Sequence, residues 1–436
     1  MKKRMIAIAA SMMMVLGLGT AMADDTITLR LSNNQPDGNV TTQACEWFAE
    51  QVKERTNGRI EIQVYNNGTL GDAVSCLEQP LEQGIVVTKY GHVEHPIPGI
   101  ICYEAGHPVP DENTFRATQA VLDITAQVSP EDTVLLLLSG GGSALFEKPL
   151  VEGAELQAIT NQLLASGADI VEINTIRKRL SAVKGGRFAQ WCAPAHVEVI
   201  VLSDILGDPP DMIASGPAAP DSSTCTDALD IVKKYDLTLS ERALSLLHRE
   251  TPKELPNVST QIIGSVRQLC HAAGKLAEEL GYEPILLTDH LDCEAREAGR
   301  FLSDILRTHA DSGRKLAFLA GGETVVHLTG KGLGGRNQEL ALAAAVGIQG
   351  LSNVCVISVG SDGTDGPTDA AGGYVNGDTV RALTEQGLRV VDVLAQNDAY
   401  HALKAVNGLI LTGPTGTNVN DVAVALVDFS PNARQT

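Results

Sequence analysis

Four glycine-rich stretches of the chain combine backbone freedom with acidic, amide and cationic side chains. They are residues 139–144 (SGGGSA), 334–339 (GGRNQE), 360–372 (GSDGTDGPTDAAG) and 412–418 (TGPTGTN). Glycine lets backbone N–H groups approach an anion closely, and a following helix adds its positive N-terminal end. We expect each stretch to follow a strand. The pattern therefore predicts an enzyme that binds a phosphorylated ligand together with a divalent cation.

Cationic side chains beside these stretches suit the same ligand. Residues 174–187 hold five basic residues and no acid in a chain of formal net charge −20. Arg and Lys both bind phosphate or a small carboxylate, although a solvated basic helix face is the alternative. Lys184 precedes two glycines, and Arg336 lies at the start of a predicted helix. A cation there opposes the helix dipole, so we expect an anion, such as a phosphoryl group, beside Arg336.

Acidic residues at predicted turns are candidates for a metal site or a general base. Asp362, Asp365 and Asp369 share one loop and would repel one another unless a cation neutralises them. Asp204 and Asp208 follow a buried strand and could hold magnesium, accept a substrate proton or cap the next helix. Calcium is disfavoured because EF-hand spacing is absent.

Composition excludes several classes of protein. The negative net charge argues against nucleic acid or an anionic membrane as partner. Eight cysteines without a Cys-x-x-Cys pair predict neither a disulfide framework nor a zinc site. Residues 330–335 fit the dinucleotide pattern G-x-G-x-x-G, but the predicted strand before them, 325–328, alternates polar and apolar residues and is not a buried strand. No P-loop pattern is present.

Apolar runs alternate with amphipathic helical segments from about residue 80 onward, which predicts α/β domains with parallel sheets. We expect two Rossmann-like three-layer domains with mostly parallel sheets, preceded by a signal peptide and an incomplete β-α-β fragment. The expected boundaries are 1–23 for the signal-peptide-like segment, 24–79 for the fragment, 80–312 for the first α/β domain and 313–430 for the second.

The N-terminal segments carry an interpretation of their own. Basic residues 2–4, the apolar run 5–18 and Ala21-Met-Ala23 have the order of a secretory signal peptide, and the run is too short to span a membrane. Residues 26–31, 43–56 and 59–65 predict a strand, a helix and a strand. This segment resembles the N-terminus of solute-binding proteins of TRAP transporters, in residues 31–34 (LSNN), 48–53 (FAEQVK), 56–62 (TNGRIEI) and 67–72 (NGTLGD).

The rest of the chain, about residues 82–428, resembles glycerate 2-kinases whose C-terminal half is the MOFRL domain. The matching words occur in order and include 86–92 (VVTKYGH), 104–112 (EAGHPVPDE), 139–145 (SGGGSAL), 172–175 (EINT), 184–187 (KGGR), 214–217 (ASGP), 321–324 (GGET), 335–339 (GRNQE), 365–372 (DGPTDAAG) and 412–419 (TGPTGTNV). Some members of this family carry a hydroxypyruvate reductase label.

The resemblance implies ATP-dependent phosphorylation of the 2-hydroxyl of D-glycerate, with Mg²⁺. It makes Arg336 the candidate for stabilising the transferred phosphoryl group, with Lys184 and Asp204 as further catalytic candidates. Asp362 and Asp365 are the metal candidates. The candidates for binding nucleotide or substrate are Ser139, Gly140, Gly141, Gly142, Ser143, Asn174, Arg187, Glu323, Asn337, Thr368, Thr415 and Asn418.

One departure from the family affects the expected activity. The family begins with a β-α unit that carries a Gly-Lys-Ala lysine, and the transporter-like segment stands in its place. We therefore expect a fusion near residue 80, a missing sheet strand and weak kinase activity. The alternatives are an NAD(P)H-dependent hydroxypyruvate reductase and a non-catalytic exported solute-binding fragment. The kinase reaction implies the cytoplasm, whereas the signal-like segment implies export; a homodimer is compatible with either.

Overall fold

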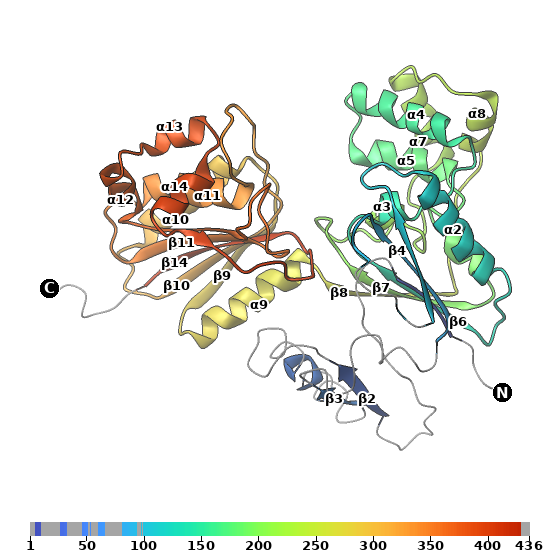
Figure 1. The fold of residues 1–436 in the computed structure, drawn as a ribbon, viewed down its shortest axis with the longest axis horizontal. Helices are drawn as coiled ribbons and strands as arrows, with labels where there is room; N and C mark the ends of the chain where they lie inside the picture. The colour runs from blue at the N-terminus through green and yellow to red at the C-terminus, as the bar shows by residue number, and fades with distance from the viewer. Residues whose placement is uncertain are drawn as a thin grey trace. The chain divides into compact units, whose positions relative to one another are not determined.

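The protein folds into two compact units (Figure 1). We describe it from a computed structural model, which describes residues 5–9, 27–32, 46–50, 53, 60–65, 81–93, 97 and 99–428. Unit 1 comprises Met1–Val201 and Pro210–Gln261, and unit 2 comprises Leu202–Pro209 and Ile262–Thr436. The expected boundary after residue 312 differs from this division, because the strand Glu283–Leu291 pairs with the strand Leu316–Gly322.

A six-stranded sheet forms the base of unit 1, in the order β5-β4-β1-β6-β7-β8. The pairs β5–β4, β4–β1, β1–β6 and β6–β7 are parallel, as predicted for this half of the chain. The strands are β1 (Met5–Ala9), β4 (Leu81–Lys89), β5 (Ile100–Ala105), β6 (Thr133–Leu138), β7 (His196–Leu202) and β8 (Val258–Gly264).

The strand that the sequence led us to expect to be missing is present. Met5–Ala9 lies between β4 and β6, with Ile8 opposite Ile85 on one side and Leu136 on the other. These residues belong to the apolar run interpreted as part of a signal peptide. Residues 10–26 lie outside the described residues, as does the proposed cleavage point after Ala23. The prediction of a sheet lacking a strand is therefore wrong for this structure.

Helices in unit 1 follow strong local signals. Asp111, Asp169 and Thr224 each form a capping box at the start of a helix. Helices α4, α5, α7 and α8 bury their apolar faces against one another in a core of their own, rather than all covering the sheet as expected. The helices are α2 (Glu112–Thr125), α3 (Gly142–Leu145), α4 (Gly153–Ala165), α5 (Ile170–Leu180), α6 (Arg187–Cys192), η2 (Ile213–Ser215), α7 (Cys225–Lys234) and α8 (Glu241–Leu247).

Unit 2 also contains a six-stranded sheet, but most of its strands are antiparallel. The order is β13-β12-β11-β14-β10-β9, and among the described pairs β10–β9 alone is parallel. The prediction of a mostly parallel second sheet is therefore wrong, because β14 and β12 return in the opposite direction. The strands are β9 (Glu283–Leu291), β10 (Leu316–Gly322), β11 (Val354–Gly360), β12 (Gly372–Asn376), β13 (Leu409–Ile410) and β14 (Asp421–Val427).

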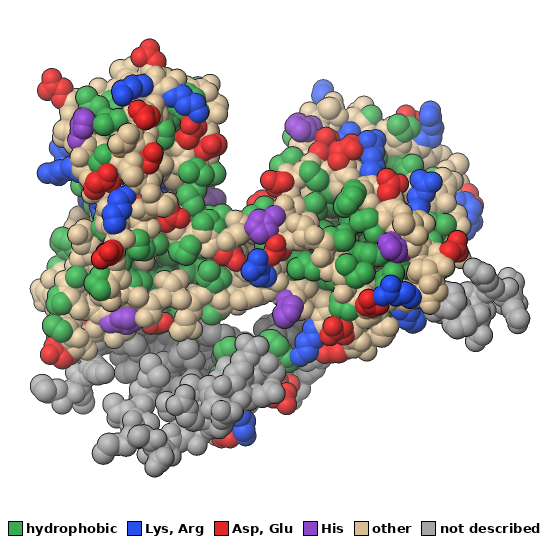
Figure 2. Space-filling view, turned by 180° about the vertical axis from the view of Figure 1, so that it is seen from behind, with side chains coloured by type: hydrophobic (Ala, Val, Ile, Leu, Met, Phe, Trp, Pro, Cys, Tyr) green, Lys and Arg blue, Asp and Glu red, His purple; other side chains and the backbone are tan. Residues whose placement is uncertain are grey.

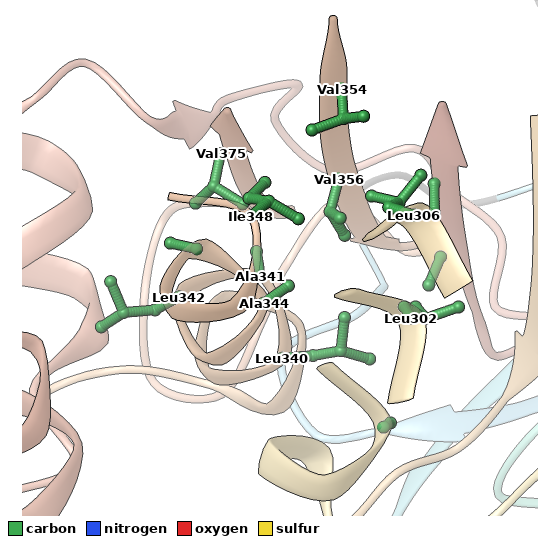
Figure 3. Packing of buried hydrophobic residues seen from close by; sticks show 14 of the residues in the cluster. Leu302, Leu306, Leu340, Ala341, Leu342, Ala344, Ile348, Val354, Val356 and Val375 are labelled. Atoms are coloured by element: carbon green, nitrogen blue, oxygen red, sulfur yellow. The ribbon is translucent and has the colours of Figure 1, made fainter. Parts of the chain in front are cut away.

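Both faces of this sheet are covered by helices, as predicted. Alternate residues of β14 point to opposite sides: Ala423 and Ala425 join the core beneath α10 and α11, while Val422 packs with Val266 of α9. Figure 3 shows α11 inserting Leu340 and Ala344 into the first of these cores. The helices are α9 (Val266–Glu279), α10 (Ala295–His309), α11 (Arg336–Gly347), α12 (Thr379–Glu385), α13 (Val390–Ala395) and α14 (Ala399–Ala405).

A separate two-stranded parallel sheet joins β2 (Ile27–Ser32) and β3 (Ile60–Tyr65), in agreement with the two strands expected in residues 24–79. Residues 46–50 and 53 between them are helical. Among the described residues, no helix combines the length and apolarity needed to cross a membrane. On the face seen in Figure 2, acidic and basic side chains are interspersed.

Candidate functional site

Three of the four glycine-rich stretches meet at one edge of the unit 2 sheet. Because β14 runs antiparallel to β10 and β11, its first residue, Asp421, pairs with Gly322 at the end of one strand and Gly360 at the end of the other. The register therefore brings the residues after β10, the residues after β11 and the residues before β14 together. The first stretch, 139–144, lies in unit 1.

Arg336, the first residue of α11, lies at this edge between two carboxylates. Its Nε and Nη2 donate to Asp421 at 2.5 and 3.1 Å, and its Nη1 donates to Glu323 at 2.7 Å. Burial of the Asp421 carboxyl raises its pKa. Burial of the Arg336 guanidinium lowers its pKa, but the hydrogen bonds to Asp421 and the charge of Asp421 outweigh burial, so the pKa of Arg336 is raised. The anion expected beside Arg336 is therefore supplied in this structure by protein carboxylates, and the guanidinium stays partly exposed.

Asp365, a predicted metal ligand, caps α11 from a neighbouring loop. Its two carboxylate oxygens accept the backbone N–H groups of Asn337 at 3.1 Å and Gln338 at 2.8 Å, and the Asn337 amide adds a contact at 3.3 Å. The helix itself has no side-chain cap at Gly335, whose lack of a Cβ leaves room for the carboxylate. Burial raises the pKa of Asp365 to about 6 despite these hydrogen bonds.

The other candidate metal ligand, Asp362, is partly buried and accepts a hydrogen bond from Thr364 N through Oδ1. Across the part of the chain that the structure describes, no group of three or more His, Cys, Asp or Glu side chains is arranged to hold a metal ion.

The remaining candidates of unit 2 form a polar network around the same edge. Thr368 accepts a hydrogen bond from Gln338 Nε2 at 2.8 Å, and Asn337 Oδ1 accepts one from the Ser358 hydroxyl at 2.6 Å. Thr415 N donates to the carbonyl of Asp362 at 3.1 Å, which ties the fourth glycine stretch to the third. Asn418 is exposed nearby, and Asp204 lies in the segment Leu202–Pro209 of the same unit.

In unit 1, the stretch Ser139–Ser143 turns from the end of β6 into α3. Gly141 has a φ of 86°, which a side chain would strain. The Ser143 hydroxyl lies 3.1 Å from that of Ser215, which donates to Asn174 Oδ1 at 3.0 Å. Ser215 has a φ of 61°, an uncommon conformation for a non-glycine residue. Two predicted residues, Ser143 and Asn174, are therefore joined by a third that the sequence did not single out.

Lys184 is fully buried behind this turn. Its ammonium donates to the carbonyls of Ser143 at 2.9 Å, Phe146 at 3.1 Å and Ala214 at 3.4 Å, and lies 3.7 Å from the buried carboxylate of Glu147. Burial lowers the pKa of Lys184 to about 8. In this structure the lysine braces the turn from behind, so its contacts are those of a positioning residue.

The basic stretch is largely neutralised by acids that are distant in sequence. Lys178 lies 3.1 Å from both Asp211 and Asp221, and Arg179 lies 3.6 Å from Asp221. Arg187 instead donates to the last carbonyls of α5, at 3.0 Å to Arg179 and 2.7 Å to Ser181. These residues therefore do not form the solvated basic helix face that was the alternative to a ligand-binding role.

Asp421 and Ser215 are the site residues that sequence reasoning missed. Neither stands in a glycine-rich stretch, and the partners of each are more than 40 residues away in sequence. The word 214–217 (ASGP), quoted above for the resemblance, was the available signal for Ser215.

Fold and site together define a two-unit α/β protein whose polar loops converge at strand ends. The model of the family described as "Domain of unknown function (DUF4147)" matches residues 31–248, and that of the MOFRL family matches residues 316–421. The chain is 53% identical to the D-glycerate 2-kinase of Thermotoga maritima, over 81% of this chain and 87% of that protein. It is 43% identical to the glycerate 2-kinase of Pyrococcus horikoshii, over 80% and 82%.

A solved structure agrees with these similarities. The crystal structure of the Thermotoga maritima glycerate kinase superimposes with a TM-score of 0.79 at 45% identity, and the match covers 98% of this chain and 92% of that one. The chain therefore belongs to the family of glycerate 2-kinases that combine a DUF4147 domain with a MOFRL domain.

Proposed function

We propose that this protein transfers the γ-phosphoryl group of ATP to the 2-hydroxyl of D-glycerate and releases 2-phosphoglycerate. The observation that carries the proposal is the high identity with a D-glycerate 2-kinase along most of both chains. The reductase alternative has less support: in the part of the chain that the structure describes, the segment 326–335, which contains the dinucleotide-like pattern, contains no strand.

Arg336 is the proposed group that neutralises charge on the transferred phosphoryl. Phosphoryl transfer depends chiefly on positioning and on electrostatic stabilisation. The bidentate pairing with Asp421 supports a fixed guanidinium plane, because two parallel hydrogen bonds restrict its rotation. Glu323 is half-exposed, and we propose that phosphoryl oxygens replace it on Nη1. Asp204 is retained as a candidate to accept the substrate proton.

We propose one set of groups in each unit that binds oxygens of the nucleotide or the substrate. The first is the turn Ser139–Ser143 with Asn174, braced by Lys184. The second comprises Asn337, Thr368, Thr415 and Asn418 at the edge of the unit 2 sheet, while Arg187 acts on the end of α5. We propose that Mg²⁺ is held mainly by phosphate oxygens, with Asp362 as the protein carboxylate, because Oδ2 of Asp362 makes no hydrogen bond to described residues.

For residues 1–79 we propose that the transporter-like and signal-like motifs come from a gene fusion and that the fused protein is a cytoplasmic kinase. The DUF4147 match begins at residue 31, so the family's sequence extends into this segment. The kinase is expected in the cytoplasm because the reaction needs ATP. The position of Met5–Ala9 in the kinase sheet supports retention of this segment. Turnover is expected to be reduced, since no counterpart of the family's Gly-Lys-Ala lysine precedes residue 82.

The test supplies ATP, Mg²⁺ and D-glycerate and couples the product to enolase without a phosphoglycerate mutase. Enolase accepts 2-phosphoglycerate, so enol product forms only if the 2-hydroxyl is phosphorylated. We expect enolase-dependent signal that is lost in Arg336→Met. Absence of signal, together with oxidation of NADH in the presence of hydroxypyruvate, would overturn the proposal in favour of a reductase. A chain that begins at residue 24 tests the N-terminal proposal: we expect it to lose stability.

A further inference from the structure

A cavity of about 670 Å³ lies in unit 1. Of the described residues that line it, Arg187 is the one named above as a candidate for binding nucleotide or substrate. Its volume falls within the range typical of small-molecule sites. The residues that line it include Leu150, Arg187, Trp191, Leu246, Arg249 and Glu250.

Two guanidinium groups at this cavity have no carboxylate ion-pair partner among the described residues. Arg187 uses Nη1 for backbone carbonyls. Neither Arg187 nor Arg249, which both line the cavity, makes an ion pair with the described residues. Burial, and then the charges of Arg179 and Arg249, lower the pKa of Arg187. The positive charges of Arg187 and Arg249 thus repel one another at a partly buried site, and an anion bound there would relieve this repulsion.

The carboxylate at the cavity, Glu250, is already neutralised. Its Oε1 accepts Cys225 N at 2.8 Å, and its Oε2 lies 3.3 Å from both Arg179 and Lys253. These contacts hold the pKa of Glu250 down at about 2, led by the hydrogen bond from Cys225 N. Its charge therefore does not cancel that of Arg187 and Arg249.

The indole ring of Trp191 lines the same cavity as Arg187 and Arg249. Trp191 is half-exposed, yet its indole Nε1 is fixed by the carbonyl of Leu122 at 3.3 Å and the hydroxyl of Thr125 at 3.2 Å. With Leu150 and Leu246 it supplies an apolar surface. A rigid aromatic ring beside guanidinium groups suits a ligand that has both an apolar body and an anionic head.

We propose that this cavity binds a small organic oxyanion, a phosphate or carboxylate carried on an apolar or aromatic body. Arg249 and Arg187 contact the oxyanion, and Trp191 packs against the body. The site is separate from that for ATP and glycerate and so goes beyond the kinase function.

Phenyl phosphate is the probe. The chain contains two tryptophans, so Trp47→Phe leaves Trp191 as the reporter. We expect saturable quenching of its fluorescence, matched by calorimetry and unchanged by saturating ATP and D-glycerate. Arg249→Ala should weaken binding by about tenfold or more, because a charge-assisted hydrogen bond is lost, and Arg249→Lys should restore part of it. Inorganic phosphate should bind more weakly, because it lacks the apolar body.

The matched control is Arg242→Ala, which removes an exposed arginine from α8, the helix that ends two residues before Arg249, and Arg242 does not line the cavity. It should leave binding unchanged. The proposal is overturned if phenyl phosphate does not bind, if ATP displaces it competitively, or if Arg242→Ala weakens binding as much as Arg249→Ala in folded protein. These experiments measure binding of phenyl phosphate and not kinase activity. A negative result would therefore count against the oxyanion site and not against the proposed kinase function.

Discussion

Arg336 and Asp421 form a bidentate ion pair across 85 residues of sequence, with Nε and Nη2 of the arginine on the two oxygens of the aspartate. The pair depends on the register of β14 with β10 and β11, which places Asp421 at the end of both strands. The carboxylate of Asp421, the first residue of β14, thus holds the guanidinium of Arg336, the first residue of α11.

The first prediction concerns this pair. Asp421→Asn leaves Arg336 in place but removes the charge and one acceptor that fix its orientation. We expect kcat to fall by about 10²-fold, because a misplaced catalytic group costs on that order, with a smaller change in KM. Steady-state kinetics with D-glycerate measures both. The control, Asp378→Asn, breaks an exposed pair with Arg381 and should match the parent. Equal kinetics for both variants would contradict a positioning role for Asp421.

The elements of this site were more predictable than their arrangement. Hydrophobic periodicity located most strands and helices, and the glycine-rich motifs marked the loops that meet at one edge of the unit 2 sheet. Strand direction was not encoded in that periodicity: Val354–Gly360 and Asp421–Val427 look alike as apolar runs, yet they pair antiparallel. The expected domain boundary differs from the division between the compact units for a related reason, since β9 belongs with β10 through pairing that only the fold reveals.

Roles of charged residues were the least predictable feature. The sequence predicts that Lys184 is a ligand-binding cation, but its burial against three carbonyls depends on Ser143 and Ala214, which lie 41 and 30 residues away. Asp365 similarly looked like a metal ligand because it stands among other acids. Its carboxylate instead caps a helix, a function that requires α11 to begin beside it.

The second prediction uses the pKa of Asp365. Burial raises it to about 6, so the folded protein favours the protonated carboxyl more than the unfolded chain does. The free energy of unfolding from this group is therefore greatest below about pH 4 and falls as pH rises to 6. Relative to Asp365→Asn, the parent should lose up to about 3 kcal/mol between these values. Urea unfolding at several pH values measures the difference.

That comparison isolates Asp365, because other titrating groups contribute equally to both proteins. A constant difference between parent and Asp365→Asn from pH 4 to 6.5 would show that the carboxyl does not titrate in this window. Asp369→Asn, an exposed change in the same loop, serves as the control and should not alter the pH profile.

The third prediction concerns the buried Lys184. Lys184→Met leaves three carbonyls and the Glu147 carboxylate without their ammonium partner. We expect the free energy of unfolding to fall by about 3–5 kcal/mol, as for other broken buried pairs. Lys148→Met, a partly buried neighbour, should change it by about 0.5 kcal/mol or less. Thermal and urea unfolding measure both variants.

A double variant separates the buried charge from the carbonyl contacts. Glu147→Gln with Lys184→Met removes both charges, so it should cost less than the sum of the single changes. If the losses in free energy of unfolding of the two single variants simply add in the double variant, Glu147 and Lys184 do not interact. Lys184 would then stabilise the turn through its carbonyl contacts alone.

The fourth prediction tests the close packing of α10 on α11 with two helix-interior glycines. A Cβ on Gly299 would lie 2.2 Å from the carbonyl oxygen of Leu340 and 3.0 Å from Ala344 N, so the helices would have to separate. A Cβ on Gly274 in α9 would lie 3.6 Å from Pro284, an ordinary contact. Gly299→Ala should lower the free energy of unfolding by about 1–3 kcal/mol.

Gly274→Ala should instead raise the free energy of unfolding by about 0.5–1 kcal/mol, because alanine restricts the unfolded chain and favours helix. Urea unfolding measures the free energy of unfolding of both variants, so the same glycine-to-alanine change is compared at a crowded position, Gly299, and at an open one, Gly274. Since α11 also begins with Arg336, Gly299→Ala should reduce turnover as well, whereas Gly274→Ala should not. Equal stabilisation by both alanines would mean that α10 and α11 are not packed at the distance described, and that the position of Arg336 does not depend on their contact.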